Sequence, residues 1–181
     1  MTAETRFRRL YDEHHRAVLS YFLRRVDRES AYDATEDVFV IAWRRIDSIP
    51  GGEIELAWLY STARGVLANH RRKTHRFTRL LGRLRDQRPE PPPEPDHQLI
   101  LGVEHRAVLG ALSTLSDRDQ EVLRLALWEE VPHGEIGRML GCSRSAVDVR
   151  IHRALGRLVK AFDRSVLKQS ARPVLRPGEE T

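Results

Sequence analysis

The chain contains 181 residues, of which 31% are charged and 7% are aromatic, and its net charge of +5 with an isoelectric point near 9.9 suits a polyanionic partner. No apolar run is long enough to span a membrane and no apolar signal segment opens the chain, so we expect a cytoplasmic protein without membrane insertion. Cys142 is the only cysteine and no histidine has a cysteine or carboxylate partner at metal-ligand spacing, so we expect no disulfide, metal or cofactor.

The first predicted helix covers residues 5–26, where apolar side chains recur at intervals of three and four. Its apolar stripe consists of Phe7, Leu10, Tyr11, Val18, Tyr21, Phe22 and Val26. We interpret this stripe as core, because aromatic residues at helical spacing usually pack against neighbouring helices. An aromatic platform on which nucleic-acid bases stack is the alternative.

The second predicted helix runs from about Ala31 to Ile46 and has one apolar and one acidic side. The apolar side contains Thr35, Val38, Phe39, Ala42 and Trp43, and the acidic side contains Asp33, Glu36 and Asp37. Carboxylates near a helix N-terminus stabilise the helix dipole by ~0.3–1 kcal/mol each, so helix stabilisation alone would explain these acids.

Residues 47–55, DSIPGGEIE, are predicted to form a loop, because Pro50 fixes its own φ and two glycines loosen the backbone. A third helix is predicted from about Leu56 to Lys73, with a stripe of Leu59, Ala63, Val66 and Leu67. Gly65 lies inside this helix at a cost of ~1 kcal/mol, which either close packing or an approach to DNA would explain. The polar end of the helix, with Asn69, Arg71, Arg72 and Lys73, suits contact with DNA phosphates.

Five prolines between positions 89 and 95 cannot continue a helix and predict a semi-rigid spacer. We therefore predict two all-α domains, residues 1–76 and 99–167, joined by a basic, proline-rich linker over 77–98. The last residues, 168–181, have two prolines and no apolar stripe, and we expect them to be disordered.

The second domain begins with helical periodicity over 99–115, followed by Ser116 as an N-cap with Asp119 three residues on. The stretch from Pro132 to Arg157, PHGEIGRMLGCSRSAVDVRIHRALGR, then predicts two short helices around a three-residue turn. Gly141 ends the first of these helices and Ser143 caps the second. This pattern is typical of a helix-turn-helix.

The second of these helices is apolar along one edge, with Val147, Ile151, Leu155 and Leu158. Its other face has Arg144, Arg150, Arg153 and Arg157. Such a helix suits the major groove, where arginine pairs with guanine and contacts phosphates. An αα-hairpin with a solvated basic face would produce the same pattern.

Three C-terminal motifs, LSTLSDRDQEVL, EIGRMLGCS and VDVRIHRALGRL, resemble the promoter-recognition domain of bacterial sigma-70 family factors, most closely the extracytoplasmic-function group. In that group the corresponding patterns are L-x-x-L-x-x-R-x-R-E-V-L, E-I-A-x-x-L-G-C-S and V-x-x-R-x-H-R-A-x-x-R-L. Two N-terminal stretches, SAYDATEDVFVIAWRRI and AWLYSTARGVLANHRRK, are similar to the family's polymerase-binding and minus-10 segments. The resemblance covers about residues 5–73 and 99–162.

The resemblance implies that the chain binds core RNA polymerase and directs promoter-specific initiation, without being an enzyme. The implied polymerase-binding residues are Asp33, Glu36, Asp37, Phe39 and Trp43. The implied residues at the minus-10 element are Ile49, Pro50, Gly51, Gly65, Asn69, Arg71, Arg72 and Lys73. The implied residues at the minus-35 element are Arg144, Ser145, Asp148, Val149, Arg150, His152 and Arg153. An anti-sigma factor is a further partner that the family implies.

Four positions depart from the family's usual residues: Glu36 replaces glutamine, Ile49 an aromatic, Gly65 asparagine, and Asp148 a basic or polar residue. Two other functions remain open from the residues alone. A helix-turn-helix regulator that acts without polymerase would need no acidic second helix, and a helical adaptor or enzyme could bind an acidic partner through the basic face.

Overall fold

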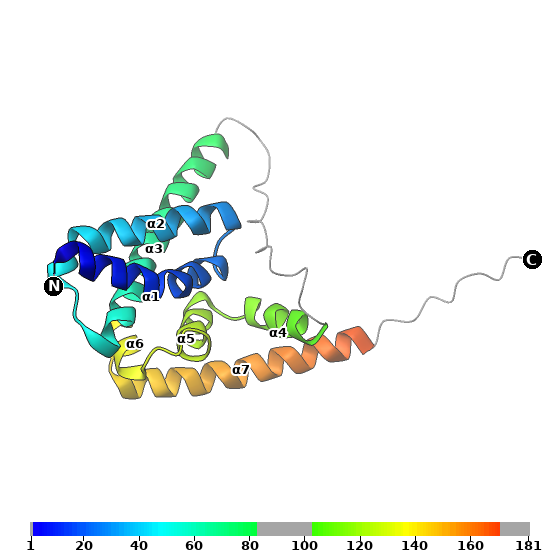
Figure 1. Ribbon diagram of the computed structural model, residues 1–181. Helices are drawn as coiled ribbons and strands as arrows, with labels where there is room; N and C mark the ends of the chain where they lie inside the picture. Colours follow the sequence, from blue (N-terminus) through cyan, green and yellow to red (C-terminus); the bar gives the residue numbers. More distant parts are fainter. Residues whose placement is uncertain (1, 83–102, 171–181) are drawn as a thin grey trace, which may run out of the picture. The chain divides into compact units, whose positions relative to one another are not determined.

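The computed structural model describes residues 2–82 and 103–170, and the chain divides into two compact units, Met1–Leu99 and Ile100–Thr181 (Figure 1). Within the described residues both units are built from helices and contain no β-strand, which confirms the predicted all-α class. The proline-rich part of the predicted linker, residues 83–98, and the tail from 171 onward lie outside the described residues.

The first unit is a three-helix arrangement in which each long helix packs on the other two. Its elements are α1 (Ala3–Leu23), α2 (Arg28–Arg44), two 3₁₀ turns (Ile46–Ser48 and Gly52–Ile54) and α3 (Glu55–Gly82). Tyr21 and Phe22 are fully buried, and the ring of Tyr11 lies 4.7 Å from that of Phe39 across α1 and α2. The aromatic stripe of the first helix is therefore core, and a base-stacking platform is not available there.

Both early helices begin at side-chain caps. The hydroxyl of Thr2 accepts a hydrogen bond from the backbone N–H of Thr5, and the carboxylate of Asp27 accepts one from that of Ser30. The Ser30 bond stabilises the charged carboxylate and lowers the pKa of Asp27. Helix α2 consequently begins at Arg28, three positions before the predicted Ala31.

An ion pair between a half-exposed arginine and a buried carboxylate joins α1 to the start of α3. The carboxylate of Glu55 is 2% exposed and accepts two hydrogen bonds from the guanidinium of Arg9, at 2.9 and 3.1 Å. These hydrogen bonds and the charge of Glu55 raise the pKa of Arg9. The imidazole Nε2 of His14 lies 3.4 Å from the same carboxylate. The pair fixes the point at which the loop ends and α3 begins.

Helix α3 is longer than predicted. It continues through Lys73 and across the predicted domain boundary at residue 76, and ends at Gly82. The extension has no proline and contains Leu80 and Leu81, both good helix formers, before the glycine.

In the second unit, helix α7 contacts each of the other three helices. The elements are α4 (Val103–Ser113), α5 (Asp117–Leu127), α6 (His133–Leu140) and α7 (Arg144–Ser170). Leu123, Leu125 and Val147 are completely buried between them. Helix α7 runs past residue 167, so the first residues of the predicted tail are helical.

The helix caps and the helix-ending glycine predicted for the second unit are present in the structure. Ser116 accepts a hydrogen bond from the backbone N–H of Asp119, and Ser143 accepts one from that of Ala146. Gly141 ends α6 in the left-handed conformation with φ of 68°. The two helices α6 and α7 with this turn form the predicted helix-turn-helix. The backbone of the turn packs closely against α6 at Gly137. A Cβ added to Gly137 would lie 2.6 Å from the carbonyl oxygen of Cys142.

Gly137→Ala is expected to destabilise the protein by about 2 kcal/mol, because the methyl group would push the turn away from α6. Gly156→Ala is the matched control. Gly156 lies inside α7 with nothing within 4 Å of an added Cβ, so alanine should stabilise the helix by about 0.5 kcal/mol. Denaturant unfolding of the full chain, followed by helical circular dichroism, measures both. Equal stability of the two variants would contradict the packing described at the turn.

Candidate functional site

The acidic side of α2 faces solvent. Asp33, Glu36 and Asp37 are all exposed, as the sequence predicted. Phe39 is 2% exposed and packs into the core, so it supports the helix from inside and cannot itself contact a partner. Trp43 is 48% exposed, and its ring lies edge-on to Phe7 at 5.2 Å. The outer face of α2 thus combines carboxylates with a half-exposed aromatic ring.

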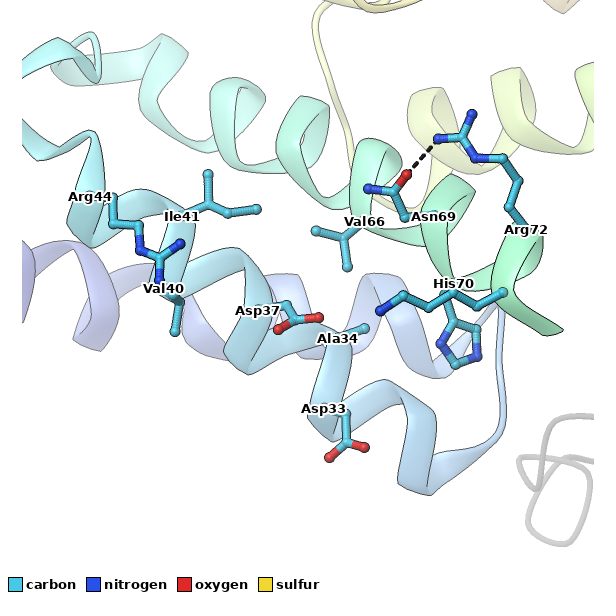
Figure 2. Close-up of a pocket in the computed structure, with 11 residues that line it drawn as sticks. Asp33, Ala34, Asp37, Val40, Ile41, Arg44, Val66, Asn69, His70 and Arg72 are labelled. Carbon is cyan, nitrogen blue, oxygen red and sulfur yellow. Dashed lines mark hydrogen bonds between the residues drawn. The ribbon is translucent and has the colours of Figure 1, made fainter. Parts of the chain in front are cut away.

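A groove of about 470 Å³ runs between α2 and the second half of α3. Asp33 and Asp37 line it from α2, and Asn69, Arg72 and Lys73 line it from α3. In Figure 2, Ala34 and Val66 lie between the acidic and the polar side chains, and the guanidinium of Arg72 donates a hydrogen bond to Asn69. The structure therefore brings together residues that the sequence assigned to two different binding sites.

The loop before α3 buries the side chain of Ile49. This side chain, which the resemblance implies at the minus-10 element, is 3% exposed, and its backbone carbonyl accepts a hydrogen bond from Arg6. The side chain of Ile49 is therefore not open to a ligand in this structure. Pro50 is half-buried and Gly51 is exposed. The apolar side chain of this loop that does reach solvent is Ile54, which is 38% exposed and which the sequence did not single out.

The basic end of α3 is open to solvent. Asn69, Arg71, Arg72 and Lys73 are all exposed. Gly65 is exposed as well, and nothing lies within 4 Å of a Cβ added to it. Of the two explanations that the sequence left for this glycine, close packing is therefore excluded in this structure.

Helix α7 presents most of the predicted DNA-reading residues on its exposed side. The exposed ones are Arg144, Ser145, Asp148, Val149, His152 and Arg153, whereas Arg150 is half-buried. Arg157 was expected on the same face, but its guanidinium donates two hydrogen bonds of 2.9 Å to the buried carboxylate of Asp119 on α5. Arg157 therefore links α7 to α5, and the basic face ends one turn earlier than predicted.

A contact that the sequence did not predict lies at the beginning of this face. The imidazole Nδ1 of His133, the first residue of α6, is 2.5 Å from Oδ1 of Asp148 on α7. Asp148 is the position where the resembling family usually has a basic or polar residue.

One group of side chains in the described part of the chain has the composition of a metal site. Ligand atoms of Glu13, His14 and Glu55 lie within 4.8 Å of one another. The guanidinium of Arg9 already contacts both carboxylates, at 2.7 Å for Glu13 and 2.9 Å for Glu55. A cation there would face this fixed positive charge, so the arrangement fits an ion-pair network better than a metal.

Over the described residues, none of the helices combines the length and the apolar character that crossing a membrane requires.

Comparison with known proteins identifies both units. Residues 10–77 match sigma-70 region 2, and residues 111–160 match sigma-70 region 4. The chain is 30% identical over 159 residues to the RNA polymerase sigma factor YlaC of Bacillus subtilis (strain 168), covering 86% of this chain and 91% of that protein. It is 30% identical over 132 residues to the probable RNA polymerase sigma factor RfaY of Xanthomonas campestris pv. campestris, covering 71% of this chain and 33% of that protein.

A solved structure supports the fold. The sigma factor RpoE of Bartonella quintana, determined with the anti-sigma factor NepR, superposes with a TM-score of 0.66 at 21% identity, over 87% of this chain and 96% of that chain.

An all-α unit with an acidic surface helix and a second unit with a basic helix-turn-helix are the two parts of a promoter-recognition subunit. The chain belongs to the sigma-70 family of RNA polymerase sigma factors. Its combination of region 2 and region 4, with YlaC as a relative of similar extent, is that of the extracytoplasmic-function group. The protein accordingly binds core RNA polymerase and directs initiation at promoters.

Proposed function

We propose that this sigma factor binds core polymerase through the outer face of α2. One observation supports this proposal most directly. The carboxylates on the exposed side of α2 are those of Asp33, Glu36 and Asp37, whereas Phe39 on the same helix is buried in the core. Core packing therefore fixes the helix while its carboxylates remain open to a partner. A cluster of exposed carboxylates attracts a basic partner and accelerates its association. Trp43 would add an apolar contact at the end of this surface.

We further propose that the minus-10 element is bound beside this face, by the exposed end of α3. Asn69 and the cationic side chains of Arg71, Arg72 and Lys73 suit a DNA strand with its phosphates. Because Asp33 and Asp37 line the same groove, polymerase and DNA would occupy adjoining surfaces of the first unit. In the loop, Pro50, Gly51 and the exposed Ile54 take the place of Ile49 as the groups that a flipped base could contact.

The minus-35 element would be read by the first turns of α7. The N-terminal residues of a recognition helix contact base edges in the major groove, and here these include Arg144, Ser145, Asp148 and Val149, followed by His152 and Arg153. Arg153 is exposed and free to reach a base, whereas the half-buried Arg150 is better placed to hold a phosphate.

Arg153→Ala is therefore expected to weaken binding to the specific promoter by ~1–3 kcal/mol and to relax the preference at one minus-35 position. Arg150→Ala should weaken binding to all duplexes to a similar extent, because a phosphate contact has no sequence information. The measurement is the affinity of each variant, in complex with polymerase, for promoter DNA and for DNA with a scrambled minus-35 element. Identical losses on both DNAs for both variants would contradict this division of roles.

We propose two further properties of the protein. An anti-sigma factor is a fitting regulator, since the similar RpoE of Bartonella quintana was solved with NepR and the exposed surfaces here offer both acidic and basic contacts. We also propose that the chain acts in the cytoplasm, where polymerase and promoter DNA are found, and that it performs no covalent chemistry of its own.

A further inference from the structure

Asp148 is an acidic side chain on the helix face that meets DNA, and α6 holds it. Its Oδ1 lies 2.5 Å from Nδ1 of His133, which is the first residue of α6, while Asp148 lies in the second turn of α7. The two residues are 15 positions apart in the sequence, and the turn at Gly141 brings them together. The contact therefore depends on the fold of the helix-turn-helix.

A free carboxylate on this face would be repelled by DNA phosphates. The bond with His133 reduces this repulsion, because an imidazole N–H donated to the carboxylate occupies one of its oxygens and offsets part of its negative charge. The second oxygen, Oδ2, can still accept a hydrogen bond. In the major groove the characteristic partner of an aspartate is the exocyclic amine of cytosine.

We propose that His133 is a positioning residue that orients Asp148 to accept a hydrogen bond from a cytosine N4 amine in the minus-35 element. The proposal rests on the role proposed above for α7. It assigns a specificity function to a histidine on the helix that precedes the recognition helix, and it explains why an acid is compatible with this face. The ligand class is a cytosine base edge in duplex DNA.

A purely structural role for the pair is poorly supported. Both side chains are considerably exposed, 39% for His133 and 49% for Asp148, and surface pairs of this kind contribute little to stability. The same corner is already fixed by the buried side chains of Ile136 and Val147 and by the left-handed Gly141. Removing the imidazole should therefore leave the fold intact and change what Asp148 can recognise.

The test uses the full chain bound to core polymerase and a set of promoters in which every minus-35 base pair is replaced in turn by the other three. For the wild type we expect one position with a preference for cytosine of about tenfold. Asp148→Ala should abolish that preference and leave the other positions unchanged. His133→Ala should reduce it to about twofold at the same position, and His133→Asn, which retains a donor near the place of Nδ1, should restore part of it.

The outcomes separate this inference from the proposed function. If His133→Ala leaves the base profile of the wild type unchanged while Asp148→Ala alters it, the positioning role is overturned. If neither variant alters the profile although Arg153→Ala does, Asp148 reads no base and the inference is overturned while the role of α7 stands. If the wild type discriminates at no minus-35 position, the proposed function itself fails and the inference fails with it. Circular dichroism of each variant checks that the fold is retained.

Discussion

Arg9→Met is expected to lower the free energy of unfolding by about 3 kcal/mol, which is the largest effect on stability that we predict for a single side chain. Glu55 is 2% exposed, and its carboxylate accepts two hydrogen bonds from the guanidinium of Arg9, at 2.9 and 3.1 Å. Without Arg9 a buried carboxylate would keep only His14, at 3.4 Å, as a neighbouring donor. Methionine preserves most of the aliphatic volume, so the loss would come from the unpaired charge rather than from a cavity. Denaturant titration of the full chain measures the difference.

Arg8→Met is the matched control for this experiment. Arg8 lies next to Arg9 on α1 and pairs with Glu4, but these two side chains are 75% and 76% exposed. An exposed pair contributes at most about 0.5 kcal/mol, so the control should unfold almost like the wild type. An equally small effect of Arg9→Met and Arg8→Met would show that the Glu55 carboxylate is stabilised without Arg9. The ion pair would then have no role in joining α1 to α3.

Asp37→Arg is expected to weaken the affinity for core polymerase by about 100-fold, because a like-charge contact across an interface costs several kcal/mol. Asp37 is exposed on α2, and its neighbours Val38 and Phe39 hold the helix in the core. The substitution should therefore leave the helical content unchanged. The effect should be greatest at low salt, where exposed charges are least screened, and should appear mainly as slower association.

Glu4→Arg is the control for the charge itself. It makes the same change of sign on α1, where the side chain is 76% exposed, and should leave polymerase affinity within about twofold of the wild type. Equal losses for Glu4→Arg and Asp37→Arg would mean that net charge, and not the face of α2, controls binding. Wild-type affinity for Asp37→Arg would remove the acidic face from the interface.

Features set by neighbouring residues could be predicted from the sequence. The cap at Ser116, the left-handed Gly141 and the cap at Ser143 each depend on a hydrogen bond or a backbone angle within a few positions, and all three are present. The same holds for the exposure of Asp33 and Asp37, because helical periodicity alone places them opposite the apolar stripe. Capping and periodicity were therefore enough to locate the helix-turn-helix and the acidic face.

Contacts between distant parts of the chain could not be predicted in this way. The partners in the Arg9–Glu55 pair are 46 positions apart, and those in the Arg157–Asp119 pair are 38 apart. The second pair withdraws one arginine from the face that the charge pattern assigned to DNA. The burial of Ile49 could not be predicted for the same reason, since it depends on how the loop folds back onto α1, where Arg6 donates a hydrogen bond to the Ile49 carbonyl.

The most direct test of the function is reconstitution of initiation. The purified protein is mixed with core polymerase that lacks other sigma factors, and transcripts are mapped on a library of promoter fragments from the source genome. We expect formation of a stable complex and transcripts from fixed start sites that disappear when either the minus-10 or the minus-35 element is scrambled, and Asp37→Arg and Arg153→Ala should each reduce them. Tight promoter binding by the protein alone, with no polymerase complex and no specific transcript, would contradict the sigma-factor function.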